Sequence, residues 1–153
     1  MSKSLLVVAH PDDEILWFSS IIDKIDKIII VFSGTEAKSV LDGRKSILNN
    51  NLLPYHKKVS FLEIDESESF DKANWDFPII NKFGIKNKIP AYEENYYKIR
   101  NILKNELSSY DIIYTHNPWG EYGHEEHVQI FKVIIDSYNY DKQQIWVSGY
   151  FSD

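Results

Sequence analysis

Near its N-terminus the chain carries an aliphatic run, residues 5–8, that ends abruptly in one imidazole and three carboxylates within residues 10–14. The run is continuous rather than alternating, so it predicts a strand over residues 3–10 that is buried on both faces, as in a parallel sheet. Pro11 prevents this strand from continuing in register. The crowded carboxylates repel one another unless a positive charge lies among them. The two candidates are the positive end of a helix that begins here and a bound cation.

The rest of the chain alternates between aliphatic segments and segments of helical period. Further strands are predicted over residues 27–32, 58–64, 111–115 and 144–150, and helices over residues 12–25, 36–50, 91–108 and 123–138. This alternation predicts a Rossmann-like, doubly wound α/β fold, with a mostly parallel sheet of about five strands and helices on both faces. With 153 residues and 43% apolar residues, we expect one domain over residues 1–153.

Two predicted helices carry apolar residues at helical spacing. Those of the first helix are Ile15, Leu16, Phe18, Ile21, Ile22 and Ile25, and those of the helix over residues 91–108 are Tyr92, Tyr96, Ile99, Ile102, Leu103 and Leu107. Residues 65–90, in contrast, show no clear period. A long irregular segment in a compact domain is commonly a functional loop, so we expect it to form a wall of a ligand cleft.

The composition excludes several classes of function. The net charge of −6 provides no basic stripe for nucleic acid. No apolar run reaches the roughly eighteen residues of a transmembrane segment, and the N-terminus lacks the features of a signal peptide, so we expect a cytoplasmic location. The chain has no cysteine, which excludes disulfides, thiolate ligands and cysteine nucleophiles. Any metal must therefore be held by nitrogen and oxygen.

The predicted strand order brings two distant clusters of ionisable residues together. If the first three strands run outward and the chain returns to place the fourth beside the first, a topological switch point lies between strands one and four. Ligands of such sheets bind at the carboxyl ends of the strands that flank this point. Those ends carry residues 10–13 on one side and residues 116–127 on the other. We therefore expect the two clusters to share one site.

Four side chains in these clusters are candidate ligands of one metal ion, namely His10, Asp13, His124 and His127. His124 and His127 are three residues apart on one predicted helix, so their side chains point the same way. Two histidines and one carboxylate can make a catalytic zinc site, whose fourth position holds a water with a pKa of about 7. The spare histidine can transfer a proton or stabilise an oxyanion, and Asp12 can act as the base. This set describes a metal-dependent hydrolase that acts on a carbonyl.

Each cluster also has a plainer interpretation. Acids at a helix start are commonly a cap, and two histidines at positions i and i+3 are by themselves weak evidence for a metal. His116 can be an ordinary strand-end residue. The first motif can also cap a helix in a nucleotide-binding domain, although no glycine-rich phosphate loop follows the first strand. The joint placement of both clusters at the switch point is what favours a metal site.

Two motifs resemble those of the PIG-L/LmbE-like N-acetylglucosaminyl deacetylases. They are Ala9-His10-Pro11-Asp12-Asp13-Glu14 followed by Leu16, and Tyr122-Gly123-His124-Glu125-Glu126-His127-Val128. The resemblance implies a zinc-dependent de-N-acetylase in which the ion is held by His10, Asp13 and His127. It further implies that Asp12 is the general base. His124 would assist the tetrahedral intermediate and the leaving amine, with Glu126 as the carboxylate that supports it.

We therefore expect a hydrolase that removes acetyl from an N-acetylated amino sugar, an N-acetylglucosamine-type conjugate, with Zn²⁺ or another divalent ion as cofactor. A sugar needs hydrogen bonds for its hydroxyls and an aromatic surface for its apolar face. Arg44, Asn117 and Trp119 follow strands two and four and are expected to meet it, the resemblance also pointing to Arg44. Trp119 has a plainer role too, as a loop anchor packed under Pro118.

Two expectations remain open at the level of the sequence. The chain ends soon after the strand that follows His127, so one wall of the substrate site is expected from residues 65–90 or from a second copy in a homo-oligomer. The alternative function, from a different class, is a catalytically idle protein that binds a sugar or supports an assembly while retaining the metal site. Acetate release separates the two.

Overall fold

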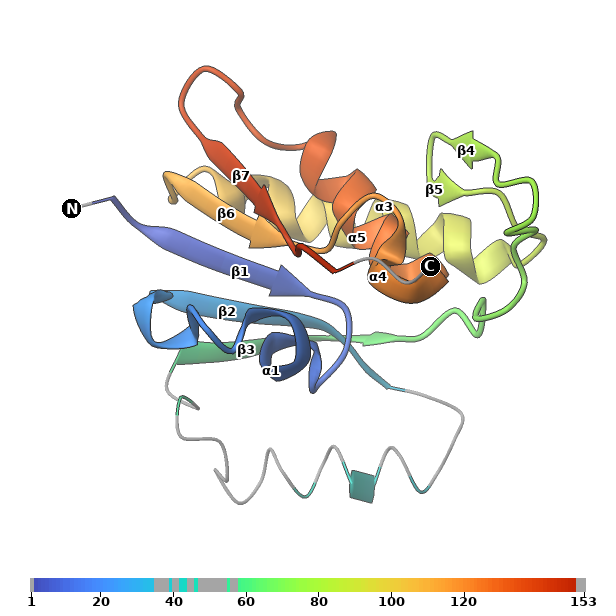
Figure 1. Cartoon of the computed structure of the whole chain (residues 1–153), viewed down its shortest axis with the longest axis horizontal. Helices are drawn as coiled ribbons and strands as arrows, with labels where there is room; N and C mark the ends of the chain where they lie inside the picture. The colour runs from blue at the N-terminus through green and yellow to red at the C-terminus, as the bar shows by residue number, and fades with distance from the viewer. Residues whose placement is uncertain are drawn as a thin grey trace.

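The computed structural model describes residues 2–34 and 58–150, together with positions 39, 42, 43, 46 and 55. Within this part of the chain, five parallel strands form one sheet. They are β1 (Ser4–Val8), β2 (Lys27–Gly34), β3 (Val59–Asp65), β6 (Ile112–Thr115) and β7 (Gln144–Val147), in the spatial order β3-β2-β1-β6-β7 (Figure 1). The predicted parallel α/β sheet is confirmed.

The topological switch point lies between β1 and β6, as predicted. Leu5 of β1 pairs with Lys27 of β2 on one side and with Ile113 of β6 on the other. The chain thus runs outward through β2 and β3 and then returns to the opposite edge of β1. Because all these strands are parallel, the residues that follow β1 and β6 emerge at the same edge of the sheet.

The side chains of β1 alternate between two hydrophobic clusters, one on each face of the sheet. Leu5 and Val7 belong to the cluster that includes α3 (Pro90–Leu107) and α5 (Glu125–Ile135), whereas Leu6 and Val8 pack with Phe18 of α1 (Asp13–Phe18). Figure 1 shows α3 and α5 on one side of the sheet and α1 on the other. Burial of each such side chain stabilises the fold by roughly 1.5–3 kcal/mol, so a strand covered on both faces is continuously aliphatic.

The first helix is shorter than predicted. The periodicity predicted a helix over residues 12–25, whereas α1 ends at Phe18 and only a 3-10 turn, η1 (Ile22–Lys24), follows. Two serines come directly after α1, and serine hydroxyls compete for backbone hydrogen bonds. The predicted apolar stripe is wrong at Ile15 and Leu16, which are 47% and 61% exposed. A helix of fewer than two turns covers the sheet with only one or two side chains.

The helix predicted over residues 123–138 is interrupted. The short helix α4 (Gly120–Gly123) and α5 meet at His124, whose backbone is extended and which caps α5. Gly123 has a φ of 93°, a conformation that favours glycine, so it ends α4. The break frees the His124 side chain to cap the following helix instead of continuing the preceding one.

The segment over residues 65–90 contains a small antiparallel hairpin, β4 (Ile80–Asn81) and β5 (Gly84–Ile85). The Tyr92 hydroxyl joins this hairpin to α5, because it accepts from the Ile85 N–H and donates to the Glu125 carbonyl. The helix predicted over residues 91–108 is α3, although Ile102, predicted to be buried, is 46% exposed. The helix predicted over residues 36–50 lies mostly outside the described residues.

Candidate metal centre

Three of the predicted ligands bring one donor atom each to a compact triangle. Nδ1 of His10 lies 3.3 Å from Nε2 of His127, and Oδ2 of Asp13 lies 3.5 Å from the first atom and 3.4 Å from the second. Ligands at about 2.0–2.1 Å from a tetrahedral zinc ion lie roughly 3.3–3.4 Å apart. The three atoms, which we call the donor triangle, are therefore spaced like three corners of a zinc tetrahedron.

The corner between β1 and α1 positions two members of the donor triangle. The backbone N–H of His10, just after β1, donates to Oδ2 of Asp13 over 2.7 Å. Nε1 of Trp17, one turn along α1, donates to Oδ1 of the same carboxylate over 3.1 Å. Burial on its own raises the pKa of Asp13, but the interactions of its carboxylate with His127, His116 and His10 outweigh it and hold the pKa well below its usual range. Asp13 is thus an ionised, oriented carboxylate.

Asp12 occupies the N-cap position of α1 but does not cap the helix through its side chain. Its side chain is exposed, and its φ of 120° is one that non-glycine residues rarely adopt. The backbone N–H of Asp12 donates to Oε2 of Glu14 over 3.0 Å, which holds this conformation. The helix-cap interpretation therefore does not explain the carboxylates. Strained residues beside buried ionisable groups are typical of functional sites.

A second carboxylate orients His10. Nε2 of His10 lies 2.9 Å from Oε2 of Glu126, whose other oxygen accepts from the backbone N–H and the hydroxyl of Ser67 over 2.6 and 2.7 Å. A carboxylate only accepts, so Nε2 of His10 carries a hydrogen and Nδ1 faces the donor triangle. Burial on its own lowers the pKa of His10, but the hydrogen bonds with Asp13 and Glu126 outweigh it and raise the pKa to about 10. The Glu126 carboxylate thus supports His10, not His124 as the sequence suggested.

His127 is oriented by Glu121, which the sequence did not single out. Nδ1 of His127 lies 2.7 Å from Oε2 of Glu121, and Nδ1 of His116 lies 2.9 Å from the same oxygen. Both imidazoles are fully buried, and burial lowers the pKa of His127 to about 4. The carboxylate accepts the Nδ1 hydrogen of His127, which leaves its Nε2 lone pair in the donor triangle. In the sequence, the only sign of this role was that Glu121 is an acidic residue between His116 and His124.

His124 is placed as a neutral hydrogen-bond donor. Its ring stacks on His127 with centroids 4.4 Å apart, and its Nδ1 accepts the backbone N–H of Glu126 over 3.3 Å. We therefore assign the ring hydrogen to Nε2. Burial, together with the positive charge of His10, lowers the pKa of His124 to about 2. The ring of His124 thus lies beside the donor triangle, with one nitrogen within 4.8 Å of ring nitrogens of His10 and His127.

Other sets of donors lie within 4.8 Å of one another in the described part of the chain, among them His10–His124–His127 and Asp13–His116–His127. In the second set, however, Nε2 of His116 already accepts the Ala9 N–H over 2.9 Å. A lone pair used in this way is not available to a cation. The donor triangle combines two imidazole nitrogens with one carboxylate oxygen, and each of its three side chains is held by a further hydrogen bond.

The comparisons with known proteins agree with this geometry. A family model described as PIG-L, GlcNAc-PI de-N-acetylase, matches residues 5–138, which include every member of the donor triangle. The chain belongs to the PIG-L family. A protein of Acanthamoeba polyphaga mimivirus, named Uncharacterized protein L374, is 28% identical over 144 residues, 88% of this chain. The chain spans 57% of the length of that relative.

Asn117 and Trp119, two of the residues expected to contact a substrate, differ in how far they are exposed. Asn117 is fully buried, and its amide is used within the chain, where it donates to the Tyr150 carbonyl and accepts the N–H groups of Trp119 and Glu121. In this structure the Asn117 amide shapes the loop after β6, and its expected contact with substrate stays a prediction. Trp119 is 52% exposed. Arg44 lies outside the described residues.

Two exposed aromatic side chains flank His124. The ring of Phe70 is tilted against that of His124 at 4.9 Å and Tyr122 stands edge-on at 6.0 Å, measured between ring centroids, and both are 47% exposed. Phe70 comes from the segment over residues 65–90, as does Ser67, which holds Glu126. The start of this irregular segment therefore lies beside the metal centre.

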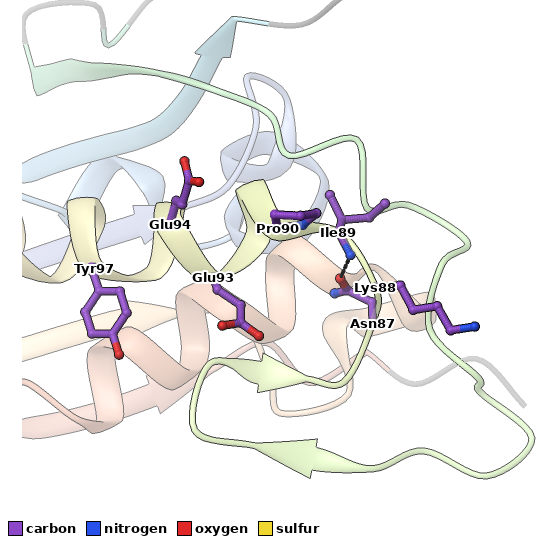
Figure 2. Close-up of a pocket in the computed structure, with 7 residues that line it drawn as sticks. All are labelled: Asn87, Lys88, Ile89, Pro90, Glu93, Glu94 and Tyr97. Carbon is purple, nitrogen blue, oxygen red and sulfur yellow. Dashed lines mark hydrogen bonds between the residues drawn. The ribbon is translucent and has the colours of Figure 1, made fainter.

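Figure 2 shows a separate open pocket of about 480 Å³ at the start of α3. Asn87, Lys88, Glu93, Glu94 and Tyr97 are among the residues that line it, and a hydrogen bond from the Ile89 N–H to Asn87 shapes its rim. It contains no histidine and none of the predicted site residues. Among the described helices, none is long and apolar enough to cross a membrane.

Proposed function

We propose that the chain is a metal-dependent hydrolase that removes the acetyl group from an N-acetylated amino sugar, an N-acetylglucosamine-type conjugate. The observation that carries this proposal is the donor triangle of His10, Asp13 and His127, with edges of 3.3, 3.5 and 3.4 Å, in a chain of the PIG-L family. De-N-acetylation is the chemistry that this family name describes, and the spacing of the donor atoms supports a metal-dependent version of it.

The three residues of the donor triangle would hold a divalent cation, and their two imidazole nitrogens and one carboxylate oxygen fit zinc best. When bound, such an ion polarises a carbonyl and lowers the pKa of a coordinated water to about 7. The chain's own contribution is orientation. Glu126 and Glu121 fix the imidazoles of His10 and His127, and Trp17 fixes Asp13. A site oriented in this way binds metal without rearrangement of its side chains.

Asp12 transfers the proton in this reaction, and His124 stabilises the developing negative charge. Water adds to the acetamide carbonyl carbon, the C–N bond breaks, and the products are acetate and a free amine. The exposed Asp12 carboxylate accepts the proton of the attacking water, and this proton is then available to the departing amine. The Nε2–H of neutral His124 donates to the oxygen on which negative charge develops.

Substrate contacts are assigned to one arginine and three aromatic side chains. Arg44 would pair with a hydroxyl or phosphate of the conjugate, and the exposed Trp119 would cover an apolar sugar face. Phe70 and Tyr122, on either side of His124, add aromatic surface close to the reacting group. A sugar ring with one apolar face and several hydroxyls suits this combination.

Acetate release from a panel of substrates tests the proposal. The zinc-loaded chain is incubated with free, nucleotide-linked, lipid-linked and thiol-linked N-acetylhexosamines, and acetate is measured by an enzyme-coupled assay. We expect release from at least one N-acetylglucosamine conjugate, and Arg44→Ala is expected to raise the KM for that conjugate with unchanged metal content. No release from any member of the panel would favour an idle sugar-binding protein instead.

Replacement of His124 separates catalysis from metal binding. His124→Ala and His124→Asn both remove the Nε2–H donor and are expected to lower kcat by about 100-fold or more with full metal content. Asparagine is a good N-cap, so His124→Asn keeps the cap of α5, whereas alanine also costs about 1 kcal/mol of stability. Steady-state kinetics, metal analysis and urea unfolding measure the three quantities. Loss of metal in His124→Asn would instead make His124 a ligand.

Metal affinity is expected to rise with pH. The raised pKa of His10, about 10, means that its Nδ1 is protonated in the metal-free chain at neutral pH. A cation must displace this proton, while His127, with a pKa of about 4, is already neutral. The association constant for Zn²⁺ is therefore expected to increase about tenfold per pH unit between about pH 6 and pH 8, with one proton released per ion. Chelator competition at several pH values measures the slope, and an affinity independent of pH would contradict the prediction.

A further inference from the structure

Glu121 is a buried carboxylate that accepts four hydrogen bonds. Its Oε2 accepts from Nδ1 of His116 and Nδ1 of His127 over 2.9 and 2.7 Å. Its Oε1 accepts from the backbone N–H of Asn117 over 3.1 Å and from the hydroxyl of Ser148. Only 2% of the residue is exposed. Three of its four partners come from the loop after β6 or from the residue after β7, so the carboxylate is held in place independently of His127.

His116 braces the same carboxylate oxygen, directly beside His127. Its Nε2 accepts the backbone N–H of Ala9, at the end of β1, over 2.9 Å. A nitrogen that accepts has no hydrogen, so the hydrogen of the neutral ring lies on Nδ1 and points to Glu121. The ring of His116 also stacks on His127, with centroids 3.9 Å apart and an angle of 18° between the planes. The switch point of the sheet therefore fixes Glu121 and, through it, the ring of His127.

The backbone of Glu121 is strained. Its φ of 59° and ψ of −76° are those of a classic γ-turn, a conformation that is rare for residues other than glycine. Glycine at this position would remove the strain, so the carboxylate accounts for the presence of a side chain here. Gly120, directly before it, also has a positive φ. The loop thus places one carboxylate against two buried imidazoles, and the strained backbone lowers the stability of the fold.

We propose that Glu121 is the positioning residue that holds His127 in its Nδ1–H tautomer, so that the Nε2 lone pair faces the donor triangle. His116, which is buried and donates to the same carboxylate oxygen, keeps Glu121 in place. This inference rests on the metal site of the proposed function. It goes beyond that function because neither the matched motifs nor the ligand set includes Glu121 or His116. Glu126 provides the corresponding bond to His10 from the opposite side.

Glu121→Gln tests the proposal with almost no change in shape. If the glutamine oxygen faces the two imidazoles, its NH₂ group lies against the Asn117 N–H and the Ser148 hydroxyl. If the amide is turned over, its NH₂ group faces two N–H donors. Neither the backbone N–H of Asn117 nor the Nδ1–H of His116 can reorient, so one of them faces the NH₂ group in either orientation. His127 then meets a neutral amide oxygen or a donor in place of the carboxylate, and both changes favour the Nε2–H tautomer, whose lone pair points away from the donor triangle.

The first readout needs no metal. Two-bond ¹H–¹⁵N spectra of the full chain, with imidazoles assigned by single histidine replacements, report which nitrogen of each ring carries the hydrogen. We expect the Nδ1–H tautomer for His127 in the unsubstituted chain and a shift toward Nε2–H in Glu121→Gln. An Nε2–H tautomer of His127 in the unsubstituted chain, or the same tautomer in both proteins, would overturn the proposal.

The second readout is the affinity for Zn²⁺, measured by competition with a chromogenic chelator. Glu121→Gln is expected to weaken it about 10- to 100-fold, the range typical of carboxylates that orient a ligating histidine. The matched control is Glu125→Gln. Glu125 is a buried carboxylate four residues along, whose Oε1 accepts the N–H groups of Lys72 and Ala73 and whose Oε2 has no hydrogen-bond partner among the residues that the structure describes. This control is expected to bind Zn²⁺ like the unsubstituted chain.

The two readouts separate this proposal from the proposed function. Equal losses of affinity in Glu121→Gln and Glu125→Gln would show a general effect of buried charge and overturn the positioning role. Failure of the unsubstituted chain to bind Zn²⁺ would overturn the metal-dependent function, while the tautomer of His127 would still decide whether Glu121 orients the ring. Circular dichroism and urea unfolding of both variants confirm that the comparison is made between folded proteins.

Discussion

Asp13→Asn is expected to abolish stoichiometric zinc binding and, with it, acetate release. Oδ2 of Asp13 is the only negatively charged atom of the donor triangle and lies 3.5 and 3.4 Å from the donor nitrogens of His10 and His127. An amide oxygen carries no net charge and is a much poorer zinc ligand. We expect the affinity to fall by more than about 100-fold, beyond the loss that follows from changing a residue that only orients a ligand. Metal analysis after dialysis against a weak chelator measures the change.

Glu14→Gln is the matched control for this experiment. Glu14 is the next residue of α1 and is also buried, but its carboxylate accepts from the Tyr55 hydroxyl and the Asp12 N–H and is not part of the donor triangle. Glu14→Gln removes the same charge as Asp13→Asn, one residue further along α1. Full zinc content in Glu14→Gln and none in Asp13→Asn would support the assignment. Stoichiometric zinc in Asp13→Asn would contradict it.

Asp12→Asn is expected to keep its zinc and to lose most of its turnover. The amide has the shape of the carboxylate but cannot accept the proton of the attacking water, and loss of a general base typically costs on the order of 100-fold or more in kcat. Asparagine also tolerates positive φ values better than most residues, so the strained backbone at φ 120° is retained. Acetate release by the zinc-loaded variant, measured beside its metal content, tests both parts of this expectation.

Two results would contradict the role of Asp12. If Asp12→Asn lost its zinc while Asp13→Asn retained it, the two carboxylates would have each other's roles. If Asp12→Asn released acetate at the normal rate, another group would accept the proton. Glu66 would then be the first to examine, because its carboxylate lies 3.6 Å from Nε2 of His10.

The general plan of this protein could be read from local patterns. A continuous aliphatic run is found where a strand is covered on both faces, and β1 is such a strand, with Leu5 and Val7 on one face and Leu6 and Val8 on the other. Strand order then follows from the alternation of strands and helices, and it brings the ends of β1 and β6 to one edge. Segments that follow neighbouring parallel strands emerge at the same edge of the sheet. The convergence of residues 10–13 with residues 116–127 could therefore be predicted from the strand order.

The partner of each side chain was decided by tertiary structure alone. Glu121 reaches His116 and His127 only because the loop adopts positive φ angles at residues 120 and 121, and no periodicity encodes a loop conformation. Glu126 faces His10 instead of His124 because Ser67, from a segment without a regular period, holds its other oxygen. Sequence periodicity thus determined which segments meet at the edge of the sheet. Individual hydrogen bonds over 2.6–2.9 Å, which depend on loop conformation, determined which carboxylate orients which imidazole.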